Sequence, residues 1–185
     1  MVYLGIGSNI MPRENIRLSL KKLTNYIDIK NISPIFLTPP LGGMPQPDFY
    51  NCVVEGKLRF DISPISFKFD VLRKIEDELG RKRGLDKYAP REIDIDILIY
   101  ENLILNSREC VIPSPEIFER DFVFAGLLYL NSELIVFPEQ QPLISLAHRY
   151  SLHLLNIDCE YTRLIWKEFL YEHRTSSTIN SRIVD

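Results

Sequence analysis

The sequence predicts an α+β protein of the ferredoxin-like kind, in which a βαββαβ chain forms an antiparallel sheet with two helices on one face. A C-terminal helical extension follows it. Two observations predict this fold. Segments of alternating hydrophobicity and segments with helical apolar spacing succeed one another in that order. The densest run of proline and glycine, residues 39–48, falls where a connection between two strands is needed.

The first half of the plan occupies residues 2–60. Residues 2–7 (VYLGIG), 32–38 (ISPIFLT) and 50–60 (YNCVVEGKLRF) are the first three expected strands. A helix is expected between the first two, after a turn at Ser8 and Asn9. Its apolar residues recur at helical spacing: Ile16, Leu20, Leu23 and Ile27.

The second half begins with a helix expected at residues 61–80, whose start and end both carry sequence signals. Ser63 can cap its start, Pro64 suits its first turn and Gly80 can end it. The fourth strand is expected at residues 93–100, IDIDILIY. Beyond it, a small hairpin and three helices are expected, at residues 102–106 with 110–113, and at 115–130, 143–150 and 160–173.

Length favours a single domain over residues 1–173. We expect its core at about 2–150, the helical extension at about 151–173 and a flexible tail at 174–185, where the sequence is polar and aperiodic.

Composition bounds the function. A net charge of −3 disfavours nucleic acid or an anionic membrane as partner. Independently of this charge, we expect a monomer that acts on small-molecule substrates. Three scattered cysteines and the lack of a signal peptide predict a cytoplasmic protein without disulfides. The longest apolar stretch, residues 122–137, is interrupted by polar residues and does not predict a membrane span.

The fourth strand carries two acids on one face. Alternation places Asp94 and Asp96 about 6 to 7 Å apart, with Leu98 and Tyr100, opposite the isoleucines at 93, 95, 97 and 99. A half-exposed strand with polar residues on its wet side is one interpretation. Aspartate is a poor strand former and close like charges repel, which favours the other interpretation, a Mg²⁺ site.

Five bases precede these acids: Arg81, Lys82, Arg83, Lys87 and Arg91. A solvated surface loop is the ordinary meaning of such a run. Arginines beside a magnesium-binding pair of acids are also what a polyphosphate requires, which favours nucleotide chemistry. Glu76 falls within the apolar stripe of the preceding helix, so we expect it to line the site.

Two further stretches are weaker signals. The GIGSN stretch at residues 5–9 lacks the third glycine of a dinucleotide fingerprint and is interpreted as a tight turn after the strand. Phe49 and Asn51, after the proline-rich loop, suit a flat heterocycle, although taken alone they are better explained by core packing.

Several of these stretches together resemble the 6-hydroxymethyl-7,8-dihydropterin pyrophosphokinase family. They are YLGIGSN, TPPLGG with QPDFYN, KYAPREIDIDIL at 87–98 and R-x-F-V at 120–123, and the resemblance covers roughly residues 2–150. It implies transfer of pyrophosphate from ATP, the co-substrate, to the pterin hydroxymethyl group, with release of AMP.

The resemblance also implies roles for individual residues. Asp94 and Asp96 would hold two Mg²⁺ ions, and together with Arg81 and Arg91 would be catalytic, with residues 81–91 closing over ATP as a lid. The implied pterin-binding residues are Thr38, Pro39, Leu41, Phe49, Asn51, Tyr88 and Phe122. The implied ATP-binding residues are Arg73, Glu76, Arg83, Arg91, Ile97, Ser114 and Arg120.

The chain departs from the family pattern in two places. Ser114 stands where the family usually has a histidine that contacts ATP, and Ala125-Gly126 where a hydrophobic-proline pair is common. Two other functions stay open: a catalytically silent module that binds a pterin or a partner, and another transferase that depends on a D-x-D pair.

Overall fold

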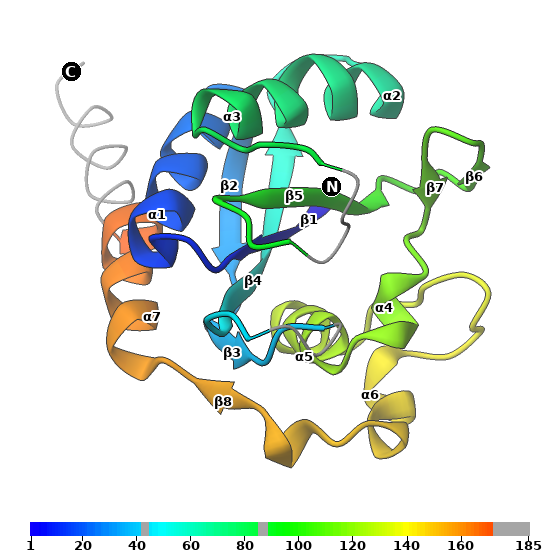
Figure 1. The fold of residues 1–185 in the computed structure, drawn as a ribbon. Coiled ribbons are helices and arrows are strands. Elements are labelled where there is room, and N and C mark those ends of the chain that lie inside the picture. The colour runs from blue at the N-terminus through cyan, green and yellow to red at the C-terminus, as the bar shows by residue number, and fades with distance from the viewer. Residues whose placement is uncertain (42–44, 85–88, 172–185) are drawn as a thin grey trace, which may run out of the picture.

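The protein is described from a computed structural model, which covers residues 1–41, 45–84 and 89–171 (Figure 1). The first part follows the expected βαββαβ order. Its elements are β1 (Val2–Ser8), α1 (Pro12–Leu23), β2 (Ile27–Ile32), β3 (Phe36–Thr38), β4 (Phe49–Leu58), α2 (Pro64–Ser66), a π-helical stretch (Phe67–Leu72), α3 (Arg73–Glu78) and β5 (Asp94–Tyr100).

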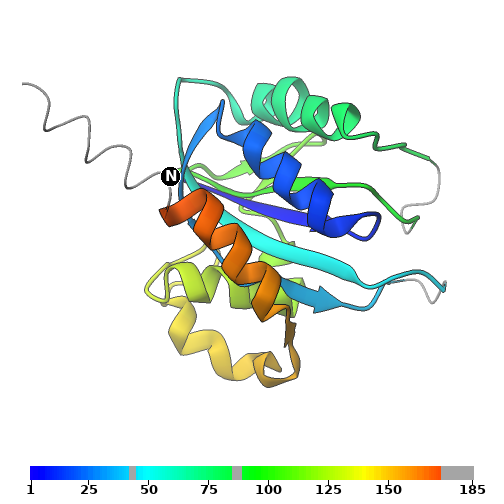
Figure 2. The same ribbon diagram turned by 90° about the vertical axis from the view of Figure 1, so that its left-hand side faces the viewer.

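The sheet confirms the ferredoxin-like fold. Its strands run β5-β1-β4, and β2 and β3 pair one after the other with the far side of β4, all antiparallel. Helix α1 and the continuous helix α2–α3 cover one face (Figure 2). The Ser63 hydroxyl accepts from the Ser66 amide, and Gly80 has a φ of 90°, so the expected start and end of α2–α3 are confirmed.

The remaining elements lie mostly on and around the opposite face. They are the hairpin β6 (Leu105–Asn106) and β7 (Val111–Ile112), α4 (Glu116–Glu119), α5 (Asp121–Leu130), α6 (Leu143–Leu146), β8 (Asn156–Ile157) and α7 (Cys159–Trp166), which a π-helical stretch extends to Tyr171. The hairpin is confirmed. The single helix expected at 115–130 is two, because Arg120 is extended.

Two apolar clusters sandwich the sheet. One joins it to α1, α2–α3 and α7, and the other joins it to α5 and α6. Helix α5 comes close to β4 through Gly126, where a Cβ would lie 2.5 Å from Val53 Cγ2. This packing accounts for the glycine in the Ala125-Gly126 pair, which departs from the family pattern. No helix among the described residues is long and apolar enough to cross a membrane.

The segment between α1 and β4 differs from the expectation. Ile27 does not belong to the first helix, which ends at Leu23, but begins β2. Of the second strand expected at residues 32–38, Ile32 ends β2 and Phe36–Thr38 form β3, whereas residues 27–31 of β2 were not expected to form a strand. Ile27 is fully buried in the cluster that also contains Leu23. Helical spacing therefore predicted correctly that Ile27 is buried, but wrongly that it is helical.

Strand β5 also departs from strict alternation. Tyr3 pairs with Ile99 and Leu4 with Ile97, so Leu98 is the extra residue of a bulge. The bulge turns Ile99 toward the α5 cluster and Tyr100 toward Phe67, at 6.1 Å between ring centroids. The expectation that Ile99 faces α1 and α2–α3, and Tyr100 the acids, is therefore wrong, while Ile95 and Ile97 lie as predicted.

Candidate functional site

A cavity of about 450 Å³ opens on the sheet face that carries α5. Strands β1, β4 and β5, the loop after β3 and the start of α5 bound it, and its size is usual for a small-molecule site. Its lining residues are Gly5, Ile6, Gly7, Thr38, Pro39, Leu41, Phe49, Asn51, Arg91, Asp94, Asp96, Glu116, Glu119, Arg120, Asp121, Phe122, Val123 and Leu155.

Glycines of β1 leave room in this cavity. Gly7 pairs with Asn51 on one side and Asp94 on the other, and a Cβ on Gly7 would lie 2.7 Å from Asn51 Oδ1. Asn51 is buried, and its Nδ2 donates to Thr38 Oγ1 at 2.9 Å. Gly5 and Gly7 are thus inside β1, as the strand expected at residues 2–7 predicted, and β1 continues one residue further, through Ser8.

Two aromatic rings stand at the edges of the cavity. Phe49 begins β4, and Phe122 lies in the first turn of α5. The guanidinium of Arg91 is 5.8 Å from the Phe49 ring centroid and that of Arg120 is 6.0 Å from the Phe122 centroid. Rings so placed, beside a carboxamide and a hydroxyl, suit a flat heterocycle with a polar edge.

Asp94 and Asp96 line the same cavity from β5, opposite Gly7 and Gly5. Burial, and then the nearby charges of Asp94 and Glu116, raise the pKa of Asp96 to about 7. A divalent cation between the two carboxylates would relieve this repulsion. The described residues hold no group of three or more potential protein ligands for a metal. Two carboxylates fit Mg²⁺ that takes its other oxygens from water and substrate phosphates.

Arginines surround Asp94 in this arrangement. Arg81 pairs with one carboxylate oxygen of Asp94 and Arg91 with the other. Arg81 also pairs with Glu76, and Arg83 pairs with both Glu76 and Asp77. Three of the five predicted bases, Arg81, Arg83 and Arg91, are therefore brought into one ion-pair network with Asp94 and Glu76 at the start of β5.

Glu76 joins this network to the edge strand. Its side chain is buried, and Oε1 accepts from the Ile95 amide at 2.8 Å, on the edge of β5 that no other strand of the described residues pairs with. Burial raises the pKa of Glu76, although the charge of Arg81 acts in the opposite direction. Glu76 therefore lies behind the two aspartates and does not line the cavity.

Asn9 links the two loops beside the cavity. Its Oδ1 accepts from the Arg91 amide at 2.8 Å, and its Nδ2 donates to Gln46 Oε1 at 2.9 Å and to the Pro47 carbonyl at 3.1 Å. The sequence predicted only that Asn9 lies in a turn. Its role as a connector depends on contacts with residues far along the chain and could not be predicted.

Besides Glu76, Arg81 and Arg83, which belong to the ion-pair network, three more predicted residues of the described part of the chain do not line the cavity: Arg73, Ile97 and Ser114. Arg73 is exposed and stacks on Phe69 at 4.1 Å, and Ile97 is buried under α2–α3. Ser114 lies in a neighbouring hollow of about 380 Å³, where its Oγ accepts from the Glu116 amide at 3.3 Å. Tyr88 lies outside the described residues.

Sequence reasoning missed three cavity residues that carry chemistry or shape: Glu116, Glu119 and Leu155. Glu116 and Glu119 are three residues apart, a helical spacing that could have placed both on one face of a helix beside Arg120. Burial raises the pKa of Glu116, and Arg120 opposes this shift. Leu155 gives no signal in the sequence, because its place depends on how the C-terminal segment returns to the sheet.

Comparison with known proteins gives a consistent result. The family model described as 7,8-dihydro-6-hydroxymethylpterin-pyrophosphokinase matches residues 3–132. The 2-amino-4-hydroxy-6-hydroxymethyldihydropteridine pyrophosphokinase of Haemophilus influenzae is 32% identical over 154 residues, which cover 82% of this chain and 93% of the relative. The protein of that name from Aquifex aeolicus is 34% identical over 135 residues, which cover 72% of this chain and 82% of that relative.

A solved structure has the same fold. It is a Plasmodium falciparum HPPK-DHPS with a TM-score of 0.63 and 15% sequence identity, and the match covers 80% of this chain and 45% of that one.

Proposed function

Since this chain belongs to the 7,8-dihydro-6-hydroxymethylpterin-pyrophosphokinase family, a family of diphosphotransferases in folate biosynthesis, we propose how its cavity performs the reaction. The cavity transfers pyrophosphate from ATP to the hydroxymethyl group of 6-hydroxymethyl-7,8-dihydropterin and releases AMP. One observation carries this assignment: paired aspartates, arginines and a two-aromatic pocket with a polar edge meet in a single cavity.

The pterin occupies the end of the cavity between Phe49 and Phe122. The rings stack on the flat heterocycle, while Asn51, held by Thr38, reads its polar edge. The backbone and side chains around Pro39 and Leu41 close this end. The hydroxymethyl group then points toward the aspartates on β5.

The triphosphate lies over Asp94 and Asp96. These carboxylates hold Mg²⁺, with two ions expected, and the bound metal supplies charge neutralisation along the phosphates and polarises the reacting oxygens. The neutral hydroxymethyl group attacks the β-phosphorus, so the residues of the cavity act mainly by positioning and by electrostatics.

Arg81 and Arg91 exchange partners during binding. Both oxygens of Asp94 accept from these arginines, so a cation that binds Asp94 meets two guanidinium charges, and this repulsion favours their moving away. Arginine forks fit phosphate oxygens, and the displaced groups have phosphates within reach. Glu76 keeps its hydrogen bond to Ile95 and is the site to which Arg81 and Arg83 return. This exchange is the expected motion of the 81–91 lid.

The nucleoside end of ATP extends toward α4. Arg120 faces the cavity there, and the hollow that contains Ser114 lies beside it, with Glu119 lining both. The hollow is lined largely by apolar side chains, which suit an adenine ring. A serine contributes no positive charge to this end, so Arg120 carries more of the contact with ATP.

The reaction is tested by incubating the protein with ATP, Mg²⁺ and 6-hydroxymethyl-7,8-dihydropterin and separating the nucleotides. AMP as the product supports the proposal, and ADP would indicate an ordinary kinase. Retained pterin binding without any turnover would support the silent module instead.

Asp96→Asn tests the metal assignment. It removes a metal ligand and a charge, so AMP release should fall by about 10³-fold or more. The thermal midpoint of the ligand-free variant should stay the same or rise, because Asp96 is a buried acid beside Asp94 and Glu116. Asp70→Asn, at an exposed position of the α2–α3 helix, is the matched control. An Asp96→Asn enzyme with wild-type turnover would exclude Asp96 as a ligand.

A further inference from the structure

The segment of residues 155–166, beyond the part of the chain that the family model matches, contacts the cavity and two of its walls. We propose that this C-terminal segment is a working part of the pterin subsite: Leu155 is a specificity-determining residue that closes it, and Thr162 and Trp166 position its walls. The inference rests on the proposed function and adds substrate contacts to it.

Leu155 reaches the cavity because the chain returns to the sheet just after it. Strand β8 pairs with β3, with Asn156 opposite Leu37 and Ile157 opposite Phe36 (Figure 1). One step further along this antiparallel ladder places Leu155 opposite Thr38, and both residues line the cavity. The wall at this end therefore combines a hydroxyl from β3 with an apolar side chain from the extension.

The extension also fixes β3 in place. The Asp158 amide donates to the Ile35 carbonyl at 3.0 Å, and the Ile35 amide donates to Thr162 Oγ1 at 2.9 Å. Trp166 Nε1 donates to the Ile32 carbonyl at 2.9 Å. These bonds hold the backbone on both sides of residues 33–35, the segment that leads into the strand bearing Thr38.

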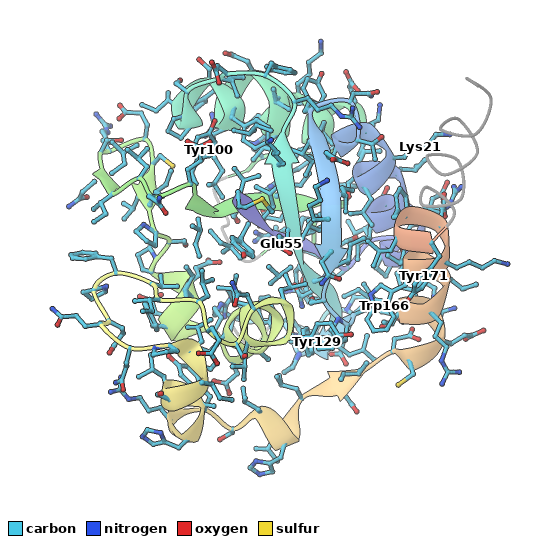
Figure 3. All side chains as sticks on the ribbon, turned by 180° about the vertical axis from the view of Figure 1, so that it is seen from behind. Lys21, Glu55, Tyr100, Tyr129, Trp166 and Tyr171 are labelled. Atoms are coloured by element: carbon cyan, nitrogen blue, oxygen red, sulfur yellow. The ribbon has the colours of Figure 1, made fainter. Side chains whose placement is uncertain are left out.

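The same helix reaches the opposite wall. Trp166 of α7 stacks on Tyr129 of α5, with ring centroids 5.8 Å apart and an interplanar angle of 18° (Figure 3). Helix α5 carries Phe122 in its first turn, at the cavity. A single helix thus contacts both the segment that leads into the strand of Thr38 and the helix that holds Phe122, which links the two walls.

This arrangement gives Leu155 a specific task. The hydrogen bond between Asn51 and Thr38 prepares the polar edge of the subsite, and such bonds are stronger where water is kept away. A leucine opposite Thr38 supplies apolar cover at that edge. We therefore expect Leu155 to set the affinity for the pterin and to leave ATP binding almost unchanged.

The test compares two adjacent leucines by equilibrium titration with 6-hydroxymethyl-7,8-dihydropterin. Leu155→Ala should raise the Kd for the pterin about 5- to 30-fold, the effect of losing most of a buried leucine contact. Leu154→Ala is the control, since Leu154 is 74% exposed and does not line the cavity. The Kd of a non-hydrolysable ATP analogue with Mg²⁺ should change less than about twofold in both variants.

Two more variants separate positioning from general stability. Leu155→Trp should fill the subsite and abolish pterin binding while the ATP analogue still binds. Thr162→Val removes the hydrogen bond to Ile35 and should raise the KM for the pterin with kcat nearly unchanged, and Thr162→Ser should restore it. Leu164→Ala, at a 54% exposed position of α7, should have no effect.

The outcomes distinguish this inference from the proposed function. Wild-type protein that neither binds the pterin nor releases AMP would overturn both. Wild-type protein that is active, with a Leu155→Ala variant that binds the pterin equally well, would overturn this inference alone. An equal loss of pterin and ATP-analogue affinity in Leu155→Ala would also overturn it.

Discussion

Asn51 is the side chain on which the polar edge of the pterin subsite depends, and Gly7 leaves it the necessary room. The gap is narrow, because a Cβ on Gly7 would lie 2.7 Å from Asn51 Oδ1. Gly5, two residues earlier on the same strand, is in ordinary surroundings, where a Cβ would meet Leu98 at 3.5 Å. These two glycines therefore have different tolerances for a methyl group.

Gly7→Ala should force Asn51 to rotate away and break its hydrogen bond to Thr38. We expect the Kd for the pterin to rise about tenfold or more, and the free energy of unfolding to fall by about 1–3 kcal/mol. Gly5→Ala should change the free energy of unfolding by less than about 1 kcal/mol. Titration and chemical denaturation measure both quantities, and equal behaviour of the two variants would refute the close contact.

Sequence reasoning located the chemistry of the site better than its construction. Asp94, Asp96 and Asn51 stood out because their residue types are unusual at those positions, and all three line the cavity. The partners of the arginines could not be predicted, since they depend on how residues 81–84 lie against β5. Gly7 was correctly placed in the first strand, but the room it leaves for Asn51 could not be predicted, because that depends on its cross-strand neighbour.

At the level of elements, helix α7 depends on one capping residue. The Asp158 carboxylate accepts from the Tyr161 amide at 2.9 Å and pairs with Arg13 at 2.7 Å. Burial raises the pKa of Asp158, but these two hydrogen bonds outweigh it and lower the pKa below the ordinary value of 3.8. The ion pair therefore stabilises the folded protein above that pH and is lost as the pH falls through the folded pKa.

Asp158→Ala and Asp158→Asn separate the cap from the charge. At pH 7 the free energy of unfolding of the alanine variant should be about 1 kcal/mol lower than that of the asparagine variant, because asparagine can still cap the helix. The asparagine variant should lose less than about 1 kcal/mol against wild type at pH 7, and this difference should vanish as the pH falls below 3.8. Urea denaturation across the pH range measures this, and a difference that grows in acid would contradict the assignment.

The elements that were misplaced or missed have different physical causes. Ile27 satisfies a helical period and a strand period equally, and its burial alone cannot choose between them. Strand β8 has two residues, too few to alternate. The bulge at Leu98 depends on the register of β1 against β5, which the sequence of β5 does not contain.

The two faces of the sheet have different roles in the molecule. The face under α1, α2–α3 and α7 is packed with apolar side chains, while the other face is shared between α5 and the cavity. The βαββαβ order was predictable because each strand and helix has its own apolar period. How residues after Tyr100 fold back over the second face was not, because it depends on contacts between distant segments.

Mg²⁺ alone should have little effect on the stability of this molecule. Both oxygens of Asp94 accept from arginines, so the bare cation competes with two ion pairs, whereas Mg²⁺ with an ATP analogue also offers those arginines phosphates. We expect the thermal midpoint to rise only with metal and nucleotide together. At a ligand concentration of one hundred times the Kd, the free energy of unfolding should increase by about 2.7 kcal/mol.

The matched control for this measurement is Asp94→Asn, which should lose most of the joint effect. An equal rise with Mg²⁺ alone at millimolar concentration would contradict the exchange of partners.

The contacts of Asn9 have a consequence for the thermodynamics of the two substrates. Asn9 bonds Arg91, on the phosphate side, and Gln46 and Pro47, on the pterin side. A ligand that orders one of these loops lowers the entropy that remains to be lost in ordering the other, so each substrate should increase the affinity for its companion by the same factor. Asn9→Ala should bring that factor toward one, even if each substrate alone binds almost as before.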